Sequence, residues 1–482
     1  MNHADLPDGT VPPLFPLLVH ASMDSVFSYR QGRAISVGEF LDDVARVASS
    51  LPNRSHVLNA CTDRYHFAVG LAAAITRGQV SLLPPSHNPE MVRQMREAYP
   101  QVYGLSEQVS ATLDLPQSVY PQRASDWGPA GQEPLAVPQI QAQQVIACVF
   151  TSGSTGRPTE HVKRWGSLVR NVRAEARRLG LSAQSGHSLV GTVPPQHMYG
   201  LESTVLVAWQ SGAAMVAERP FYPADVSATL AALPSPKVLV TTPFHLRTWL
   251  AESEQVPHAD LIVSATAPLS SQLAKEAEQR CGGPLLEVYG STETGQLATR
   301  RSAQAVQWLA FEGLQMSQQE DGQVWVHGGH LEEPMALNDV LEMCEPLISR
   351  DGVAARFILH GRSADMVNVA GKRTSLGYLN LQLNAIAGVV DGAFIWPETD
   401  ARAGDGPQDG VKRLAAVVVA PMLSAAQLTT ALRQRIDPAF MPRPLYFVDQ
   451  LPRNATGKLP HAAILELARR LESGAQPPSS SP

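Results

Sequence analysis

The sequence is short of charge and of long apolar runs, and each shortage argues against a class of protein. Only 17% of the 482 residues are charged and the net charge is −6, so the chain carries no basic field for nucleic acid. No apolar run approaches the length of a membrane span, and the first residues lack the layout of a secretory signal. We therefore expect a cytoplasmic protein with no membrane span and no nucleic-acid partner.

Cysteine is scarce as well. The four cysteines have no paired spacing, which argues against a disulfide framework and against a cysteine-based metal site. They are Cys61, Cys148, Cys281 and Cys344. Such isolated cysteines are typical of small buried side chains in a reducing compartment.

What the chain does contain is an alternation of apolar strands and amphipathic helices. Strands predicted at 57–61 and 79–83 enclose a helix at about 65–77, which is typical of βαβ units and a parallel sheet. Further strands, each ending in small or polar residues, are predicted at 145–150, 238–242, 261–264 and 285–289. Because ligands bind beyond the carboxyl ends of strands in open α/β sheets, the residues after these strands are the first candidates for a site.

The length of the chain predicts more than one domain, because a single core rarely serves so many residues. The pattern changes near 349–361, and a small module follows with alternating strands and helices up to residue 471. We expect an α/β protein whose large N-terminal domain, residues 1–360, is built of stacked, mostly parallel αβ subdomains. A small, mobile α+β domain at 361–472 and a disordered tail at 473–482 follow.

The predicted strand at 145–150 leads into a run of small hydroxyl residues and glycines, from Thr151 to Pro158. Glycine lets the backbone approach an anion closely, and main-chain N–H groups and hydroxyls donate to phosphate oxygens. Taken alone, the run also fits an ordinary solvated turn. It is not a Walker-type P-loop, because Gly156 is followed by Arg-Pro-Thr and not by a lysine with a serine or threonine.

Three later segments carry chemistry of their own. Residues 289–295 place an aromatic ring, a threonine and a carboxylate on one turn, which suits a nucleobase, a phosphate and Mg²⁺, although a helix-capping Glu293 would give the same pattern. Residues 361–373 could be a charged surface hairpin. Residues 454–459 contain the pair Gly457-Lys458, which would expose a mobile ammonium, although a turn with one solvated lysine is the alternative.

In this order, the four segments resemble the motifs of the adenylate-forming superfamily of acyl-CoA synthetases, peptide-synthetase adenylation domains and luciferases. The resemblance extends from about residue 57 to 471. A looser fifth match at 194–200 places His197 where the family has a histidine or aromatic beside the acyl pocket; a satisfied core histidine is the alternative. The sequence of residues 151–165, with His161, Lys163 and Trp165, is similar to the corresponding segment of ligases from bacterial aryl-polyene and xanthomonadin-type pigment pathways.

The resemblance implies an AMP-forming acid–thiol ligase. A small aryl or fatty carboxylic acid, with aryl favoured, would react with ATP to give an acyl-adenylate, and a thiol would then displace AMP. ATP, Mg²⁺ and either coenzyme A or the phosphopantetheine of an acyl carrier protein are the implied cofactors and partners.

The resemblance also implies a role for each matching residue. The phosphates would be held by Thr151, Ser152, Gly153, Ser154, Thr155 and Gly156. Adenine would pack on Tyr289 and Gly290, the α-phosphate would bind Thr292, and Glu293 would hold Mg²⁺. Asp339 would bind the ribose with help from Arg362, with Asp351 as a rival, and Lys458 would be the catalytic lysine.

The chain also departs from the family pattern. Thr159-Glu160-His161 stands where the family has a lysine and a glycine, so Lys163 is a candidate for the missing charge. Ala364 replaces an expected Asp or Lys at the hinge. These departures leave two alternatives open: a catalytically weakened nucleotide- or acyl-binding relic, and adenylation without thioester formation.

Overall fold

The computed structural model describes residues 13–121, 136–152, 158–349, 352–362, 365–369, 372–396, 414–454, 457 and 459–472. Several predicted site residues lie outside these ranges: Gly153, Ser154, Thr155, Gly156, Asp351, Ala364 and Lys458. Ser152 is described by its backbone alone, and the predicted tail at 473–482 also lies outside. Within the described ranges, no helix is both long enough and apolar enough to cross a membrane.

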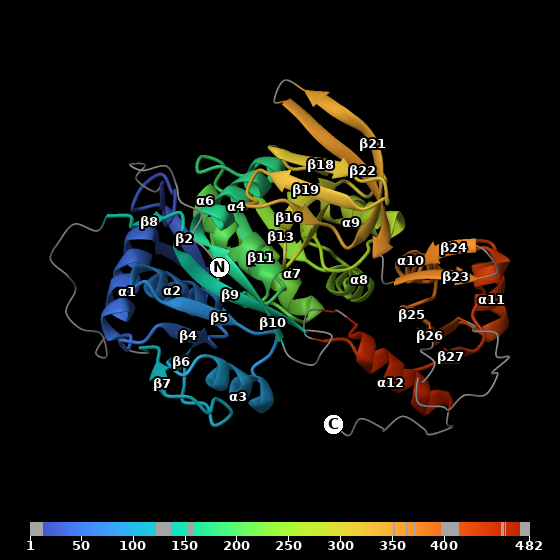
Figure 1. The fold of residues 1–482 in the computed structure, drawn as a ribbon, viewed down its shortest axis with the longest axis horizontal. Helices are drawn as coiled ribbons and strands as arrows, with labels where there is room; N and C mark the ends of the chain where they lie inside the picture. Colours follow the sequence, from blue (N-terminus) through green and yellow to red (C-terminus); the bar gives the residue numbers. More distant parts are fainter. Residues whose placement is uncertain are drawn as a thin grey trace.

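A first sheet of six described strands forms one layer of the large N-terminal part of the chain (Figure 1). Its order is β10 (Pro158–Arg164), β9 (Val145–Ser152), β5 (Val80–Leu83), β4 (His56–Asn59), β6 (Val102–Ser106) and β7 (Gln117–Val119). All neighbours are parallel except β10, which returns antiparallel along β9. The helices of this unit are α1 (Val37–Ser50), α2 (Arg64–Thr76) and α3 (Pro89–Ala98). The predicted βαβ order of this region is confirmed.

A second sheet of eleven described strands forms the centre of the molecule. In spatial order its strands are β21 (Asp339–Ser349), β22 (Gly352–Arg362), β17 (Trp308–Ala310), β16 (Gly295–Arg300), β15 (Leu285–Ser291), β14 (Leu261–Ser264), β13 (Lys237–Thr241), β11 (Ser188–Gly191), β12 (Ala214–Val216), β2 (Val26–Arg30) and β3 (Arg33–Ser36). The stretch from β15 to β2 is parallel, and both ends of the sheet are antiparallel. The β21–β22 hairpin extends away from the body in Figure 1.

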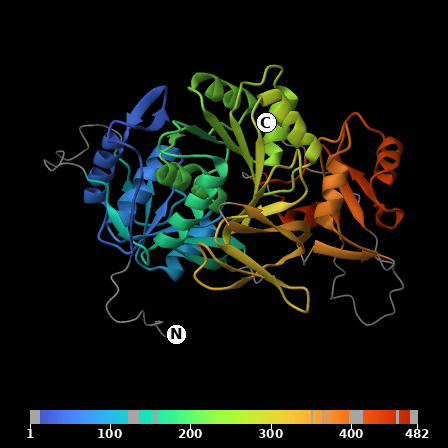
Figure 2. The ribbon, with the colours of Figure 1, turned by 90° about the horizontal axis from the view of Figure 1, so that it is seen from above.

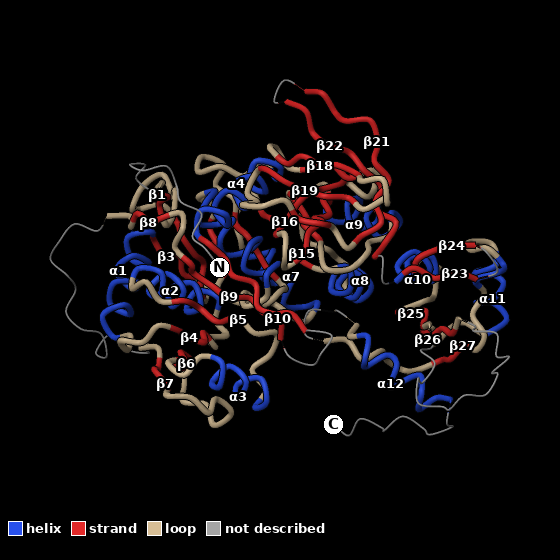
Figure 3. The backbone as a smooth tube through the Cα atoms, in the orientation of Figure 1, coloured by secondary structure: helices blue, strands red, loops and turns tan. Residues whose placement is uncertain are grey.

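Helices cover this central sheet, and Figure 3 shows them in blue around its strands. They are α4 (Trp165–Leu179), α5 (Met198–Gly200), the π-helix η2 (Leu201–Leu206), α6 (Val207–Ser211), α7 (Pro223–Ala232), α8 (Pro243–Glu252) and α9 (Ser271–Cys281). The helix α4 ends as the sequence predicts, because Gly180 adopts φ +72°, a left-handed conformation that stops a helix. Two smaller sheets complete the large N-terminal part. One consists of β18 (Leu314–Gln318), β19 (Val324–Gly328) and β20 (Met335–Ala336), and the other pairs β1 (Leu14–Pro16) with β8 (Gln139–Gln141).

One buried core joins the two large sheets. Val57 and Ile146 of the first sheet and Val238 and Val263 of the second belong to the same apolar cluster. At its edge the fully buried guanidinium of Arg64 donates to the carbonyls of Gly191, Val193, Val216 and Glu218, at 2.9 to 3.1 Å. A burial of this kind is tolerated because both terminal nitrogens of the guanidinium are paired, although Nε has no hydrogen-bond partner among the described residues.

The C-terminal part has its own apolar clusters, made only of residues after 366. It contains the hairpin β23 (Met366–Val369) and β24 (Lys372–Ser375), the sheet β25 (Asp391–Ile395), β26 (Ala415–Val419) and β27 (Leu445–Phe447), and the helices α10 (Leu376–Asn384), α11 (Ala425–Arg433) and α12 (His461–Glu472), with a short 3₁₀ turn at Pro438–Phe440. Figures 1 and 2 both show this part, coloured orange to red, beside the larger one.

Few described polar contacts join the two parts. Arg247 of α8 donates to Asn384 Oδ1 at 3.2 Å and to the Val390 carbonyl at 3.1 Å. The Arg453 guanidinium lies 5.7 Å from the ring centre of Phe244 and pairs with Asp391 at 2.6 Å. The C-terminal part is therefore attached at α8 and also at the end of β22, where the Ser375 hydroxyl donates to the His360 carbonyl at 2.5 Å.

Candidate active site

The turn after β15 is the centre of the candidate site. The strand β15 ends at Ser291, and the chain returns as β16 from Gly295, whose φ is +68°. The Ser291 hydroxyl accepts the Thr294 N–H at 3.2 Å, and a Cβ on Gly290 would lie 2.3 Å from the Gly295 carbonyl oxygen. The turn is thus a tight hairpin that requires glycine at its base. The alternative in which Glu293 caps a helix is wrong, because a strand follows.

Tyr289, just before this turn, is almost fully buried in an aromatic cluster. Its ring packs against Trp308 and Phe357 with centroid distances of 5.7 and 5.6 Å. Its hydroxyl donates to Asp339 Oδ2 at 2.7 Å, which links β15 to β21 across 50 residues of sequence. The ring is held in one orientation, as a platform for a base would need.

Asp339 begins β21 and is the cross-strand partner of Arg362 at the end of β22. Burial raises the pKa of Asp339, while the Tyr289 hydroxyl and the Arg362 charge act in the opposite direction. The structure therefore brings Tyr289, Asp339 and Arg362 together, as the sequence predicts. The rival Asp351 lies outside the described residues, so the ribose assignment stays a prediction.

Glu293 lies at the tip of the turn and faces the first sheet. Its side chain is 41% exposed, and its Oε1 is 3.9 Å from His161 Nε2, which itself lies 3.0 Å from the Thr151 hydroxyl. Burial would raise the pKa of Glu293, but its own main-chain N–H, the Ser291 hydroxyl and the charges of His161 and Lys163 together hold it below the ordinary value. The carboxylate is consequently ionised and accessible.

These residues fit Mg²⁺, which binds through one or two carboxylates and takes its other ligands from phosphate and water. Glu293 supplies one such oxygen next to the start of the phosphate run. Among the described residues, no group of three or more His, Cys, Asp or Glu side chains could hold a metal ion without outside ligands. The donor set therefore suits a magnesium–nucleotide complex better than a metal site made of protein alone.

Lys163, on the strand β10, contacts the main chain of the same turn. Its side chain is buried, and Nζ donates to the Thr292 carbonyl and, at 3.5 Å, to the Glu293 carbonyl. His330 Nε2 lies 2.7 Å from the carbonyl of Thr294. Burial lowers the pKa of His330 to about 4, so the ring is neutral and Nε2–H is the donor. Reasoning from the sequence missed these contacts; only the spacing of His161 and Lys163, two apart on one strand, signals that both face one side.

A cavity of about 590 Å³ adjoins the turn and is lined in part by Lys163, Asn171, Met198, Glu202 and Gly295. Asn171 and Glu202 are almost fully buried, yet Asn171 Oδ1 and Glu202 Oε1 have no hydrogen-bond partner among the described residues. The cavity combines apolar and polar walls, as small-molecule pockets do.

His197 immediately precedes α5 and is half-buried. The neighbouring Tyr199 donates to the carbonyls of Thr241 and Val263, both at 3.1 Å, and so fixes α5 over the ends of β13 and β14. This places His197 near the carboxyl edge of the sheet, but no described contact joins it to Glu293 or Tyr289. Its role at an acyl pocket stays a prediction.

Lys458 itself lies outside the described residues, but its neighbour Gly457 does not. A Cβ on Gly457 would lie 3.0 Å from Phe244 Cβ and 3.3 Å from Thr242 Oγ1, just beyond the carboxyl end of β13. The strands β13, β14 and β15 are parallel neighbours, so their carboxyl ends share one edge. With strands about 4.8 Å apart, Gly457 docks about two strands, or roughly 10 Å, from the strand that leads to Glu293.

Comparison with known proteins agrees with this geometry. The sequence model of the family described as AMP-binding enzyme matches residues 19–310. The 4-coumarate–CoA ligase of Rhodobacter capsulatus is 29% identical over 322 residues, which cover 66% of this chain and 76% of the relative. The indoleacetate–CoA ligase of Aromatoleum aromaticum is 26% identical over 362 residues, 69% of each chain. The ATP-bound structure of MatB from Rhodopseudomonas palustris is similar in fold, with a TM-score of 0.76, 18% identity, and coverage of 94% of this chain and 97% of that one.

Proposed function

The chain belongs to the AMP-binding enzyme family, and from this premise we propose that it is an ATP-dependent acid–thiol ligase. In the first step a carboxylate oxygen attacks the α-phosphorus of ATP, the bond to the bridging oxygen breaks, and pyrophosphate leaves. In the second step a thiolate attacks the acyl carbon of the acyl-adenylate, AMP leaves, and a thioester forms. The thiol proton passes to solvent.

The observation that carries the proposal is the meeting of three groups at one sheet edge. Tyr289, Asp339 and Arg362 form a platform with a paired carboxylate for the nucleoside. Glu293 stands between this platform and Thr151, where the phosphate run begins. Gly457, which precedes Lys458, docks at the same edge.

Each remaining role is assigned by position in the motif. Residues 151–156 would hold the β- and γ-phosphates, Gly290 would let adenine approach, and Thr292 would bind the α-phosphate. Glu293 would hold Mg²⁺, which supplies charge neutralisation on the phosphates when bound. The Lys458 ammonium would lie between the carboxylate and the α-phosphate, where negative charge develops.

The proposed substrate is a small acid, with aryl acids favoured. The relatives are named for coumarate and indoleacetate, both aryl acids. The cavity beside Gly295 has space for a ring, since pockets of about 300–1,000 Å³ hold such ligands. The acceptor is coenzyme A or the phosphopantetheine of a carrier protein in the cytoplasm. The pigment-pathway resemblance favours an aryl acid and is compatible with either acceptor. The proposed domain division remains 1–360 and 361–472, with the smaller part moving between the two steps.

The test is ATP–pyrophosphate exchange with a panel of aryl and fatty acids, for the wild type and for Lys458→Ala. We expect acid-dependent exchange that falls by about 10²–10³-fold in Lys458→Ala, the usual cost of one transition-state donor, with little change in ATP affinity. The matched control is Arg470→Ala, which removes an exposed cation of the same part that pairs with Glu466 at 2.9 Å. It should leave exchange unchanged.

Two outcomes would favour the alternatives. Tight ATP binding without exchange for any acid would identify a relic and refute the ligase. Exchange without thioester formation on either coenzyme A or a phosphopantetheinylated carrier would restrict the activity to adenylation.

A further inference from the structure

The strand β10 follows the phosphate run and places two basic side chains on one face. His161 and Lys163 are two residues apart, and alternate residues of a strand point to the same side. Both reach the hairpin turn after β15: His161 approaches the Glu293 carboxylate, and Lys163 reaches the main chain. The strand that leaves the phosphate run thus also touches the turn that carries the proposed magnesium ligand.

Lys163 acts on the two peptide groups that flank Glu293. The Thr292 carbonyl belongs to the peptide before the Glu293 Cα, and the Glu293 carbonyl to the peptide after it. Because each peptide is planar, holding both carbonyls from one ammonium fixes φ and ψ of Glu293 and therefore the direction of its side chain. His330 holds the third carbonyl, that of Thr294, at 2.7 Å.

Burial makes this contact expensive unless it is compensated. Lys163 is only 8% exposed, and the 2% exposed Glu202 lines the same cavity with an oxygen that has no described partner. An ammonium buried in this way needs acceptors and a counter-charge. The two carbonyls supply the acceptors, and the ionised Glu293 carboxylate acts on the ammonium as a counter-charge. Burial raises the pKa of Glu202 to about 8, so this carboxyl is largely neutral at pH 7.

We infer that Lys163 is a positioning residue, which holds the main chain of the Thr292–Glu293 turn so that the Glu293 carboxylate is aimed at the magnesium–nucleotide complex. The inference rests on the proposed function, since it assumes that Glu293 meets Mg²⁺.

The test compares Lys163→Met, which keeps the length of the side chain and removes its donors, with Lys163→Arg, which keeps the charge. Isothermal titration calorimetry measures the affinity for ATP with Mg²⁺ and, separately, with chelator. We expect Lys163→Met to weaken binding of ATP with Mg²⁺ by about tenfold, the loss of about 1.4 kcal/mol from a charged hydrogen bond, and to leave metal-free ATP binding unchanged. Lys163→Arg should recover part of the loss, and kcat for exchange should fall more than KM for the acid rises.

The matched control is Lys237→Met. Lys237 is also buried, at 9% exposure, and its Nζ donates to the Leu230 carbonyl at 2.7 Å, at the start of β13 and far in sequence from the turn. We expect this variant to lose thermal stability as Lys163→Met does, but to keep its affinity for ATP with Mg²⁺. An equal loss of Mg²⁺-dependent affinity in both variants would reduce Lys163 to a structural role and overturn the inference.

A second variant keeps the inference testable should Lys163→Met fail to fold. Lys163→Gln keeps a neutral N–H donor and removes the ammonium, and should weaken Mg²⁺-dependent ATP binding by about threefold, which corresponds to about 0.7 kcal/mol. No shift in Lys163→Gln contradicts the inference, whereas recovery in Lys163→Arg agrees with it. The titration needs no acid substrate, so a wild type that binds ATP with Mg²⁺ but shows no exchange refutes the ligase and leaves the positioning role standing. Equal wild-type affinity with and without Mg²⁺ refutes the role of Glu293 and this inference with it.

Discussion

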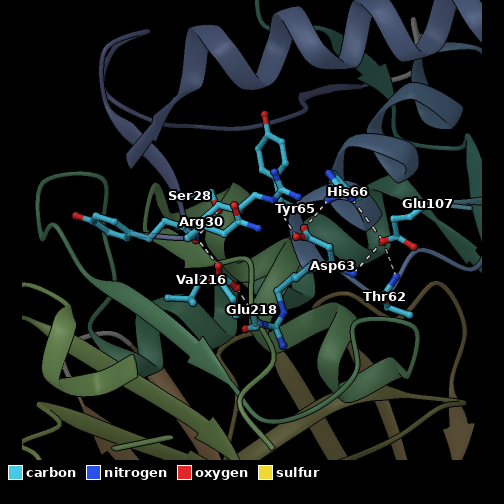
Figure 4. A network of polar contacts seen from close by, with 12 residues as sticks. Ser28, Arg30, Thr62, Asp63, Tyr65, His66, Glu107, Val216 and Glu218 are labelled. Atoms are coloured by element: carbon cyan, nitrogen blue, oxygen red, sulfur yellow. Dashed lines mark hydrogen bonds and ion pairs between the residues drawn. The ribbon is translucent and has the colours of Figure 1, made fainter. Parts of the chain in front are cut away.

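Two carboxylate networks in the large N-terminal part are built in opposite ways. At the Asp63–Glu107 corner, shown in Figure 4, Glu107 Oε1 accepts the N–H groups of Thr62 and Asp63 at 2.8 and 3.0 Å and lies 3.5 Å from His66 Nδ1, while Asp63 pairs with Arg30 at 2.8 Å. At the β15–β16 turn, the strongest side-chain contacts go to the main chain, and the Glu293 carboxylate stays 41% exposed against 20% for Glu107.

The difference separates a structural acid from a candidate functional one. At the corner, protein donors bind the carboxylate oxygens directly and hold them in place. At the turn, protein donors hold the main chain, and the carboxylate oxygens remain accessible to a ligand. A shifted pKa alone does not distinguish a structural from a functional carboxylate, because protein contacts hold the pKa of both Glu107 and Glu293 below its ordinary value.

The largest expected effect is that of Glu293→Gln, which removes the charge and keeps the shape. We expect exchange to fall by about 10²–10³-fold and the Mg²⁺ requirement to rise, since one electrostatic contact to the transition state is lost. The melting temperature should stay within about 1–2 °C of the wild type, because few protein donors use this carboxylate. An unchanged Mg²⁺ titration would mean that Glu293 is a structural acid like Glu107, and the proposed difference between the two carboxylates would be wrong.

Glu107→Gln should have the reverse profile, with a smaller effect. Loss of the charged acceptor for two N–H groups should cost about 1–2 kcal/mol of unfolding free energy at pH 7, while exchange at 25 °C is unchanged. Because folding lowers the pKa of Glu107, its stabilisation is present above the unfolded pKa, near 4.5, and is lost as pH falls through the folded pKa.

Urea denaturation of both proteins between pH 7 and pH 3 measures this difference. The gap between the unfolding free energies of wild type and Glu107→Gln should be constant above about pH 5.5 and should narrow as the pH falls below 4.5. A gap that persists at low pH would mean that shape, and not charge, makes the corner stable.

Only some of the parallel strands were predicted from the sequence: β4, β5, β9, β13, β14 and β15 were, whereas the parallel strands β6, β11 and β12 and the antiparallel strands β16 to β21 were not. The strand predicted at 261–264 has the bounds observed. The strand predicted at 145–150 is two residues longer in the structure, where it ends at Ser152. These strands are short apolar runs buried on both faces, so their pattern is local. No strand was predicted between 295 and 348, where β16 to β21 lie, because half-exposed strands such as Leu314–Gln318 mix polar and apolar residues.

The candidate site divides in a similar way. Tyr289 and Glu293 follow a predicted strand and could be found from it, whereas Asp339 could be placed only through the family resemblance, since its contact with Tyr289 spans 50 residues. The sequence marks Lys163 only as a candidate for the charge missing from the phosphate run. Its actual partners are carbonyl oxygens, which every residue carries, so no side-chain pattern in the sequence marks the contact.

The smallest expected effect tests whether the contact between Tyr289 and Asp339 serves ligand binding, as proposed for the β15–β16 turn, or only stability. Tyr289→Phe keeps the ring against Trp308 and Phe357 and removes the hydrogen bond to Asp339. The loss of about 1 kcal/mol should weaken ATP binding by about fivefold, because Asp339 is then free to turn from the ribose. Tyr103→Phe is the matched control: its buried hydroxyl donates to Gln79 at 2.8 Å in the first sheet, so its removal should cost similar stability and no affinity. Equal ATP affinity in the two variants would mean that the Tyr289–Asp339 bond closes a structural network, as at the Glu107 corner, and that the ribose is held elsewhere.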